Sequence, residues 1–366
     1  MPAYIHSIET SLPGFEYRQI DLRDHMKHLI GESELNRRII HQVYSRSGIE
    51  TRYSILEDFK TTIPGEGSLF FNGHGASPPT GYRNDMYIRE GRNLFINTAK
   101  KLCKSGNTQP DEITHLITVS CTGFYAPGPD VDIIQSLGMK PDIERYHLGF
   151  MGCYAAMSAL KMAATICGND KNANVMIVSA ELCSLHFKAS IKTDDIISAS
   201  VFGDGAAGAL VRSEKPAVKG FKMNAFASTI TKKGSKDMAW SIGDKGFNMI
   251  LSAYIPELLA GGLNDFLDPV LKKYGLDTED VSRWAIHPGG RAILDKVESC
   301  LKLPEKSLES SRYVLSNFGN MSSATILFVL DQILKKTNDP ANENEQIIAM
   351  AFGPGLTIES AHLTLI

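Results

Sequence analysis

The sequence predicts an α/β fold made of two duplicated halves, and two observations carry this prediction. The first is internal repetition at a nearly constant offset: residues 111–120 resemble residues 279–288, 168 positions later, and residues 145–153 resemble residues 312–320, 167 positions later. The second is the alternation of short apolar segments with longer amphipathic ones in each half. This alternation is typical of sheets that are covered by helices on both faces.

Each half contains the same expected order of elements. An amphipathic helix is followed by a polar turn and an apolar strand, and a loop with Gly and Pro then leads to a second helix. A short apolar strand, a tight turn, a long apolar helix and a last strand complete the half. The predicted ranges are 91–103, 115–120, 130–137, 146–150, 154–167 and 174–179 in the first half, and 262–274, 283–287, 292–301, 313–315, 321–334 and 346–351 in the second.

The two long helices at 154–167 and 321–334 are apolar nearly all round, which is typical of buried helices. We expect them to pack against each other at the axis that relates the halves. The halves are therefore expected to form one fused core, with residues 1–213 and 214–366 as its two parts. Residues 60–84, rich in Gly, Pro, Ser and Asn, predict a long surface excursion, and residues 232–237 predict a second polar loop.

Composition excludes several classes of protein. The 366 residues carry 38 Lys and Arg against 41 Asp and Glu, a balance that argues against nucleic-acid binding. No apolar run approaches the ~18 residues needed to span a bilayer. The six cysteines form no CxxC pair, which argues against a structural zinc site, and the N-terminus does not resemble a secretory signal. We expect a soluble, cytoplasmic protein that binds neither metal nor membrane.

Three residues stand out because they occupy matching ends of the repeated elements. Cys153 and Asn320 each follow a Gly at the turn into a long apolar helix, and His287 ends a strand before Pro288. A helix N-terminus lowers the pKa of a thiol. Taken singly, Cys153 could be a small buried side chain, His287 a loop residue and Asn320 a helix cap. Together they match a Cys–His–Asn nucleophilic arrangement.

Several strings resemble the type III polyketide synthases, the relatives of chalcone and stilbene synthases. They are WAIHPGGRAILDKVE (284–298), SNFGNMSSAT (316–325), VFGDGAAG (201–208), FGPGLTIE (352–359), CTGFYAPGPDVDIIQSLG (121–138) and GCYAA (152–156). The resemblance covers roughly residues 42–359 and is strongest in the C-terminal half. It implies the thiolase fold, a duplicated five-layered αβαβα architecture, which agrees with the repeat.

The resemblance also implies a reaction. Cys153 would take an acyl group from a CoA thioester, and His287 would keep Cys153 as a thiolate. His287 and Asn320 would bind the malonyl thioester carbonyl and stabilise the enolate formed as CO₂ leaves. The enolate would then attack the acylated cysteine in a Claisen condensation. Phe202 would be a gatekeeper between a CoA tunnel and the cavity, and Ser322 would line the cavity behind Asn320. No cofactor is implied beyond the acyl-CoA and malonyl-CoA substrates.

Further family positions concern substrate binding. Cations at the mouth of the CoA tunnel would correspond to Arg46 and Arg52, and Arg291 is a third candidate; for each, a solvated surface charge is the alternative. The elongation cavity would be lined by Cys121, Cys183, His186, Gly246 and Ser322. A homodimer is implied, with the partner met by residues 120–138.

The chain departs from the plant pattern at several positions. Phe150 and Met151 replace two glutamines, Ala126 replaces a Met that reaches the neighbouring subunit, and Cys183 and His186 replace threonines. We therefore expect products unlike chalcone, with small or aliphatic starters preferred. Two alternatives stay open: a ketosynthase-III-like enzyme fed by acyl carrier protein, and a catalytically silent partner subunit of the same fold.

Overall fold

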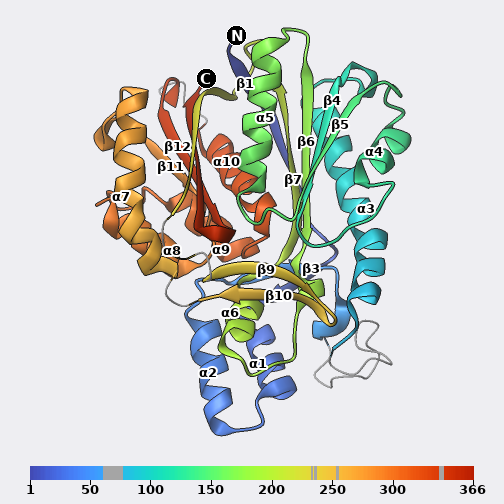
Figure 1. Cartoon of the computed structure of the whole chain (residues 1–366), viewed down its shortest axis with the longest axis vertical. Helices are drawn as coiled ribbons and strands as arrows, with labels where there is room; N and C mark the ends of the chain where they lie inside the picture. Colours follow the sequence, from blue (N-terminus) through green and yellow to red (C-terminus); the bar gives the residue numbers. More distant parts are fainter. Residues whose placement is uncertain (61–76, 232–233, 235–236, 253–254, 338–341) are drawn as a thin grey trace.

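The computed structural model describes residues 1–60, 77–231, 234, 237–252, 255–337 and 342–366 (Figure 1). Most of the predicted excursion at 60–84 and of the loop at 232–237 lies outside these residues. The helix that we expected from residue 91 begins earlier, because α3 spans Thr80–Ser105. The last residues of the predicted excursion are therefore helical.

Nine strands form one sheet that runs through both halves of the chain. The first half supplies β5 (Glu144–Gly149), β4 (His115–Ser120), β6 (Asn174–Leu182), β7 (Asp204–Arg212) and β1 (Ala3–Ser11), in that spatial order. The second half continues with β8 (Phe221–Ile230), β13 (Thr357–Leu365), β12 (Gln346–Gly353) and β11 (Arg283–Ile286). Antiparallel pairing of β1 with β8 joins the two parts.

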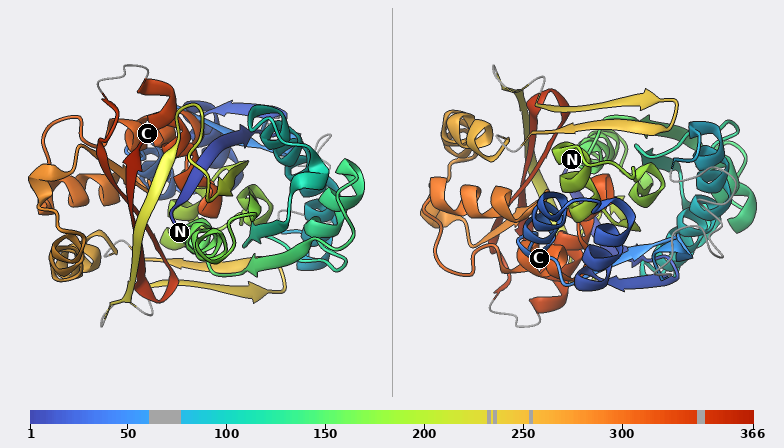
Figure 2. Two further views of the ribbon diagram at one scale, coloured as in Figure 1. Left: turned by 90° about the horizontal axis from the view of Figure 1, so that it is seen from above. Right: turned by 90° about the horizontal axis from the view of Figure 1, so that it is seen from below.

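The helices and the two half-sheets form five layers, and alternate side chains of each strand pack into the layers on its two faces. In β6, Val175 and Ile177 pack on one face and Met176 and Val178 on the other, and β12 alternates in the same way. The inner faces of both half-sheets pack on α5 (Ala155–Asn169) and α10 (Thr325–Lys336). The outer faces are covered by α3 and α4 (Pro129–Leu137) on one side and by α7 (Ile255–Tyr274) and α8 (Arg291–Cys300) on the other (Figure 2). The predicted αβαβα architecture is confirmed.

The two halves differ where the sequence predicted one more strand. Residues 313–315 were expected to match β5 but lie inside the helix α9 (Glu309–Phe318), so that strand prediction is wrong. The buried residues Ser310, Ser311, Val314 and Leu315 recur at helical spacing, and this places one face of α9 against the core. The second half therefore contributes four strands to the sheet where the first contributes five.

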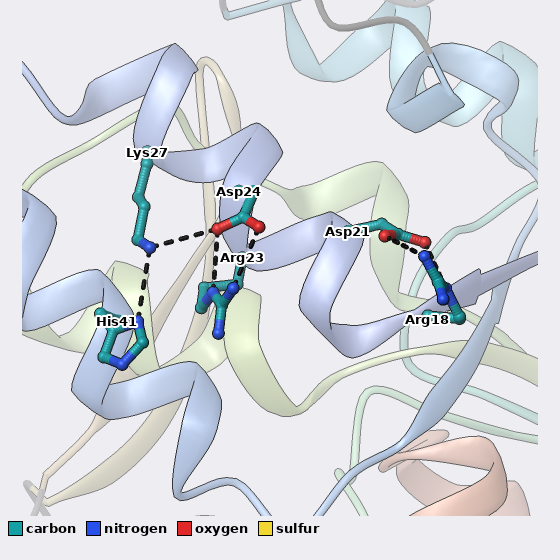
Figure 3. Close-up of polar contacts among 6 residues, drawn as sticks. All are labelled: Arg18, Asp21, Arg23, Asp24, Lys27 and His41. Carbon is teal, nitrogen blue, oxygen red and sulfur yellow. Dashed lines mark hydrogen bonds and ion pairs between the residues drawn. The ribbon is translucent and has the colours of Figure 1, made fainter.

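A smaller helical layer lies beyond one end of the sheet (Figure 1). It consists of α1 (Gln19–Ile30), α2 (Glu34–Ser45) and α6 (Thr193–Val201), with the short pair β2 (Phe15–Arg18) and β3 (Thr51–Ser54) beside it. Within α1, Asp24 accepts from Arg23 and from Lys27, and the Lys27 ammonium lies 3.3 Å from His41 Nδ1 of α2 (Figure 3). The hairpin β9 (Met238–Gly243) and β10 (Gly246–Leu251) crosses between this layer and the sheet.

Candidate active site

Two adjoining cavities lie where the sheet meets the helical layer. The first, of about 610 Å³, contains Cys121, Cys153 and Cys183, and we call it the cysteine chamber. The second, of about 780 Å³, is lined by Tyr17, Tyr44, Phe59, Phe187 and Phe247, and we call it the aromatic chamber. Four residues line both chambers: Cys183, Phe202, Trp240 and Met249.

Cys153 lies in the turn that leads into α5. Gly152 precedes it with a φ of 96°, a left-handed conformation that favours glycine, and a Cβ there would overlap the ring of Pro354. The Cys153 thiol lies 3.6 Å from Ser322 Oγ. Burial raises the pKa of Cys153 to about 11, in spite of the hydrogen bonds from Ser322 and Asn320. The sequence predicted a lowered pKa from the helix N-terminus, and this is wrong: α5 begins at Ala155, two residues after Cys153, and burial of the thiol raises its pKa.

His287 follows β11 and is almost completely enclosed, with 1% of its surface exposed. Its backbone N–H donates to the Met350 carbonyl at 2.8 Å, which extends the β11–β12 ladder to the chamber wall. Neither ring nitrogen has a hydrogen-bond partner among the described residues. Burial lowers the pKa of His287 to about 3, so the ring is neutral. A buried, unpartnered imidazole that lines a cavity is available to a ligand as donor or acceptor.

Asn320 presents its side-chain amide in a fixed orientation. Oδ1 accepts from the Ser322 N–H at 2.9 Å and from Thr325 Oγ1 at 3.4 Å, whereas Nδ2 lies 3.3 Å from the Gly289 carbonyl. Ser322 holds a φ of 47°, an uncommon conformation for a residue with a side chain. The acceptor oxygen is thus used by the protein and one N–H of the amide donates to the Gly289 carbonyl, so the second N–H remains for a ligand in the cysteine chamber.

Phe202 lines both chambers, and the backbone on either side of it is hydrogen-bonded to the backbone of Asn320. The Asn320 N–H donates to the Val201 carbonyl at 2.8 Å, and the Gly203 N–H donates back to the Asn320 carbonyl at 2.9 Å. Arg52 donates to the carbonyls of Phe202 and Ala199, the latter at 2.8 Å. Arg52 is buried, so the structure places this residue differently from a solvent-facing cation at a tunnel mouth: it holds the Phe202 segment in place.

Arg46 and Arg291 are exposed and lie on neighbouring segments. Arg46 follows the last residue of α2, and the side chain of Arg291 packs close to Gly48, two residues after Arg46. Arg291 also lies 3.4 Å from Asp295. The segment that carries Arg291 contributes Gly289 and Ile293 to the cysteine chamber, so both cations stand near one side of that chamber.

The remaining predicted pocket residues separate into two groups. Cys121, Cys183 and Ser322 line the cysteine chamber and His186 lines the aromatic chamber, whereas Gly246 lines neither. Gly246 begins β10 with a φ of 89°, against the guanidinium of Arg83, and its successor Phe247 lines the aromatic chamber instead.

His186 does not offer its ring nitrogens to a ligand. Nε2 donates to the Thr122 carbonyl at 2.7 Å, and Nδ1 accepts from the Phe247 N–H at 3.1 Å. The ring also stacks on Phe247, with 3.9 Å between centroids. Burial lowers the pKa of His186 to about 3, which keeps it neutral and able to accept at Nδ1. His186 therefore clamps the β9–β10 hairpin onto the end of β4.

Sequence reasoning missed three residues. Trp240 and Met249 come from the β9–β10 hairpin and line both chambers, and the Trp240 indole N–H donates to the Cys121 carbonyl at 3.1 Å. Glu181 is buried at the end of β6 and accepts from the Cys121 N–H, Thr122 Oγ1 and Ser323 Oγ. Burial raises the pKa of Glu181. Its sequence signal is an acid near the end of a mostly apolar strand, where an unpartnered carboxylate would be costly.

The described residues contain no group of three or more His, Cys, Asp or Glu that could hold a metal ion. Among the same residues, no helix is both long and apolar enough to cross a membrane.

A thiolase-type fold with a cysteine, a histidine and an asparagine on one buried cavity defines an acyl-transferring enzyme. The chain belongs to the chalcone and stilbene synthase family: the model of the N-terminal domain matches residues 2–215 and that of the C-terminal domain matches residues 222–366. It is thus a type III polyketide synthase.

Two crystal structures are similar over the whole chain. PKS-I from the brown alga Ectocarpus siliculosus is 27% identical, with a TM-score of 0.93 over 100% of this chain and 98% of that one. The C-terminal type III polyketide synthase domain of Steely1, a type I/III hybrid from Dictyostelium, is 26% identical, with a TM-score of 0.91 over 100% and 99%.

Proposed function

We propose that the enzyme condenses malonyl-CoA with an acyl group held as a thioester on Cys153. The sulfur attacks the carbonyl of an acyl-CoA, the new C–S bond forms, and CoA leaves as the thiol. The observation that carries this proposal is the convergence of Cys153, His287 and Asn320 on one buried chamber. The other two cysteines of that chamber have pKa values raised well above the usual range by burial, which disfavours them as nucleophiles.

The resting pair of Cys153 and His287 is a neutral thiol and a neutral imidazole, because burial raises the pKa of one and lowers that of the other. His287 therefore acts as a general base: it takes the thiol proton as the sulfur attacks and returns it to the departing CoA sulfur. This differs from a preformed thiolate–imidazolium pair. In a chamber with little water, charge separation before the substrate enters is costly.

Extension of the acyl chain requires hydrogen-bond donors that stabilise the negatively charged enolate oxygen. When malonyl-CoA loses CO₂, the electrons of the broken C–C bond move to the thioester oxygen, and a ring N–H of His287 with Nδ2 of Asn320 stabilises the enolate. The enolate carbon then attacks the acyl-Cys153 carbonyl, the C–S bond breaks, and the β-ketoacyl chain stays on CoA. Repetition of these steps gives a polyketide.

The outer features are proposed on the same basis. Arg46 and Arg291 contact CoA phosphates beside the cysteine chamber, and Phe202 gates passage between the chambers. Each subunit is one unit made of two halves, residues 1–213 and 214–366. Two subunits form a homodimer that meets through residues 120–138. The enzyme works in the cytoplasm, as the sequence predicts. Light scattering tests the dimer, because a stable monomer at micromolar concentration would contradict it.

Mass spectrometry of products tests the proposed function. Malonyl-CoA is supplied with a panel of acyl-CoAs, and carrier protein is left out. The wild type is expected to release CO₂ and form extended products, and Cys153→Ala is expected to form none. Condensation that requires acyl carrier protein, or that survives in Cys153→Ala, would refute the proposal. Cys300→Ala, on the outer helix α8, is the matched control.

A further inference from the structure

The turn that carries Cys153 contains two residues in the left-handed region, and only one of them is a glycine. We call residues 150–153 the nucleophile turn. Phe150 has a φ of 59° and Gly152 a φ of 96°. Glycine adopts this conformation freely, whereas phenylalanine adopts it rarely and at a cost. Such a backbone persists only where the surrounding structure holds it, and it occurs most often at functional sites.

Hydrogen bonds hold the nucleophile turn against the end of β4. The Phe150 N–H donates to the Ser120 carbonyl at 3.1 Å, next to the last residue pair of β4 and β5. The Gly152 N–H donates to Cys121 Sγ at 3.0 Å. The carbonyl of Cys121 also accepts from the Trp240 indole N–H at 3.1 Å. The nucleophile turn and the β9–β10 hairpin are therefore both bonded to Cys121.

The ring of Phe150 makes a second connection between the turn and the hairpin. Its centroid lies 5.6 Å from that of Phe247 on β10, edge to face, and 5.4 Å from that of Phe124. Phe124 and Phe247 are 6.0 Å apart, so each ring contacts the other two, and we call the three residues the ring cluster. Aromatic pairs at such separations are favourable beyond the area that they bury. These contacts oppose the cost of the left-handed backbone at Phe150.

Phe247 connects the ring cluster to the junction where the two chambers meet. Its ring stacks on His186 at 3.9 Å and meets Trp240 edge to face at 5.6 Å. Trp240 and Met249 belong to the same hairpin and line both chambers. A shift of Phe247 would therefore move side chains that border the junction. Phe150 itself lines neither chamber, so it acts on a substrate only through its neighbours.

We propose that Phe150 is a positioning residue: its ring holds the nucleophile turn and the β9–β10 hairpin in one arrangement, so that Cys153 keeps its place relative to the junction of the chambers. This inference rests on the proposed function, because it concerns the geometry in which Cys153 reacts. Without the ring, the turn and the hairpin lose one of their two connections. Misplacement by about 1 Å, even from a mutation away from the chemistry, can cost ~10²-fold in rate.

Tryptophan fluorescence tests this arrangement without any substrate. Trp284→Phe removes the other tryptophan of the chain, so that emission comes from Trp240 alone. In that background, Phe150→Leu and Phe150→Gly are expected to shift the Trp240 emission to longer wavelength and to increase its quenching by acrylamide, because the hairpin becomes more open to water. Phe150→Tyr, which keeps the ring, is expected to match the parent. Unchanged emission in both variants that lack the ring would overturn the proposal.

The same two variants separate the ring from the backbone. Glycine adopts the left-handed conformation freely, whereas leucine bears a cost there as phenylalanine does. Acylation of Cys153 by acetyl-CoA, followed by intact-protein mass, is expected to slow about tenfold or more in both. If only the backbone mattered, Phe150→Gly would react as fast as the wild type. A wild-type rate in Phe150→Gly would therefore overturn the proposal.

Phe226→Leu on β8 is the matched control. Phe226 is a half-buried phenylalanine that packs on the core and lines neither chamber. This variant loses a ring as Phe150→Leu does, but it should keep the Trp240 emission and the acylation rate of the parent. Every variant is measured well below its thermal transition, so that lower stability alone does not reduce the rate. Equal effects in Phe226→Leu and Phe150→Leu would show a general packing role and overturn the proposal.

The outcomes separate this inference from the function on which it rests. An enzyme that never acylates Cys153 would refute the proposed condensation, and the Trp240 emission would still decide whether Phe150 holds the hairpin. A wild-type enzyme that condenses malonyl-CoA, together with Phe150 variants that change neither emission nor acylation, would refute the inference alone. If Phe150→Leu fails to fold, Phe150→Gly decides, because glycine bears no backbone cost at this position.

Discussion

Replacement of Asn320 should separate extension from loading. Asn320→Ala removes the Nδ2 donor proposed to stabilise the enolate, and loss of one such donor typically costs ~2.7–4 kcal/mol, or ~10²–10³ in rate. The same change removes the oxygen that accepts from the Ser322 N–H at 2.9 Å, and a buried N–H left unpaired costs ~1–3 kcal/mol of folding stability. Asn320→Asp keeps that acceptor but offers no amide N–H, either to a ligand or to the Gly289 carbonyl.

The assay follows the two steps separately in the same preparations. Release of labelled CO₂ from malonyl-CoA reports decarboxylation, and intact-protein mass after exposure to an acyl-CoA reports acylation of Cys153. Both Asn320 variants are expected to lose decarboxylation by ~10²–10³ and to keep most of the acylation. Asn317→Ala on α9, whose amide donates to the Tyr313 carbonyl and lines neither chamber, is the control. Decarboxylation at the wild-type rate in Asn320→Asp would refute the donor role.

Three further outcomes are expected. Because burial raises the pKa of Cys153 to about 11, its alkylation by iodoacetamide should accelerate about tenfold per pH unit from neutral pH upward, and a plateau near neutral pH would instead indicate a preformed thiolate. His186→Thr should loosen the β9–β10 hairpin, because it removes the hydrogen bonds of both ring nitrogens, and should lower the free energy of unfolding by ~1–3 kcal/mol. The product profile, measured by mass spectrometry, should also change. An unchanged profile would show that His186 does not shape the chambers. Gly152→Ala should reduce stability in urea more than Gly138→Ala does, because both positions have positive φ but only the Cβ at 152 meets another residue; equal losses would contradict the packing argument.

The strands and buried helices could be predicted because the spacing of apolar residues along the sequence reflects which side chains are buried. Residues 175–178 are apolar without interruption, and β6 is buried on both faces. The helix at 154–167 is apolar nearly all round, and α5 lies between the half-sheets. The strand predicted at 313–315 fails for the opposite reason. The letters Arg-Tyr-x-Leu occur in β5 and in α9, so four residues do not decide the backbone, and the surrounding packing does.

The predicted nucleophile and its two partners reach one chamber because each ends a repeated element, and the duplication brings those ends together. The pKa of Cys153 could not be predicted in the same way. Proximity to a helix is visible in the sequence, but the burial that raises the pKa arises only when the second half, with residues such as Phe352 and Pro354, closes the chamber.

Arg52 and the hairpin residues show a second limit. Arg52 looks like any basic residue near the N-terminus, and only the folded chain brings the carbonyls of Ala199 and Phe202 to its guanidinium. Trp240 and Met249 line both chambers because the hairpin folds back across the end of the sheet, a tertiary event without a local signal.

The identity of the acylated residue tests the proposed catalytic site most directly. The enzyme is exposed to a labelled acyl-CoA without malonyl-CoA, quenched in acid, digested and mapped by tandem mass spectrometry. We expect a single thioester adduct on Cys153, absent from Cys153→Ala and much reduced in His287→Ala. An adduct chiefly on Cys121 or Cys183, the other thiols of the same chamber, would contradict it.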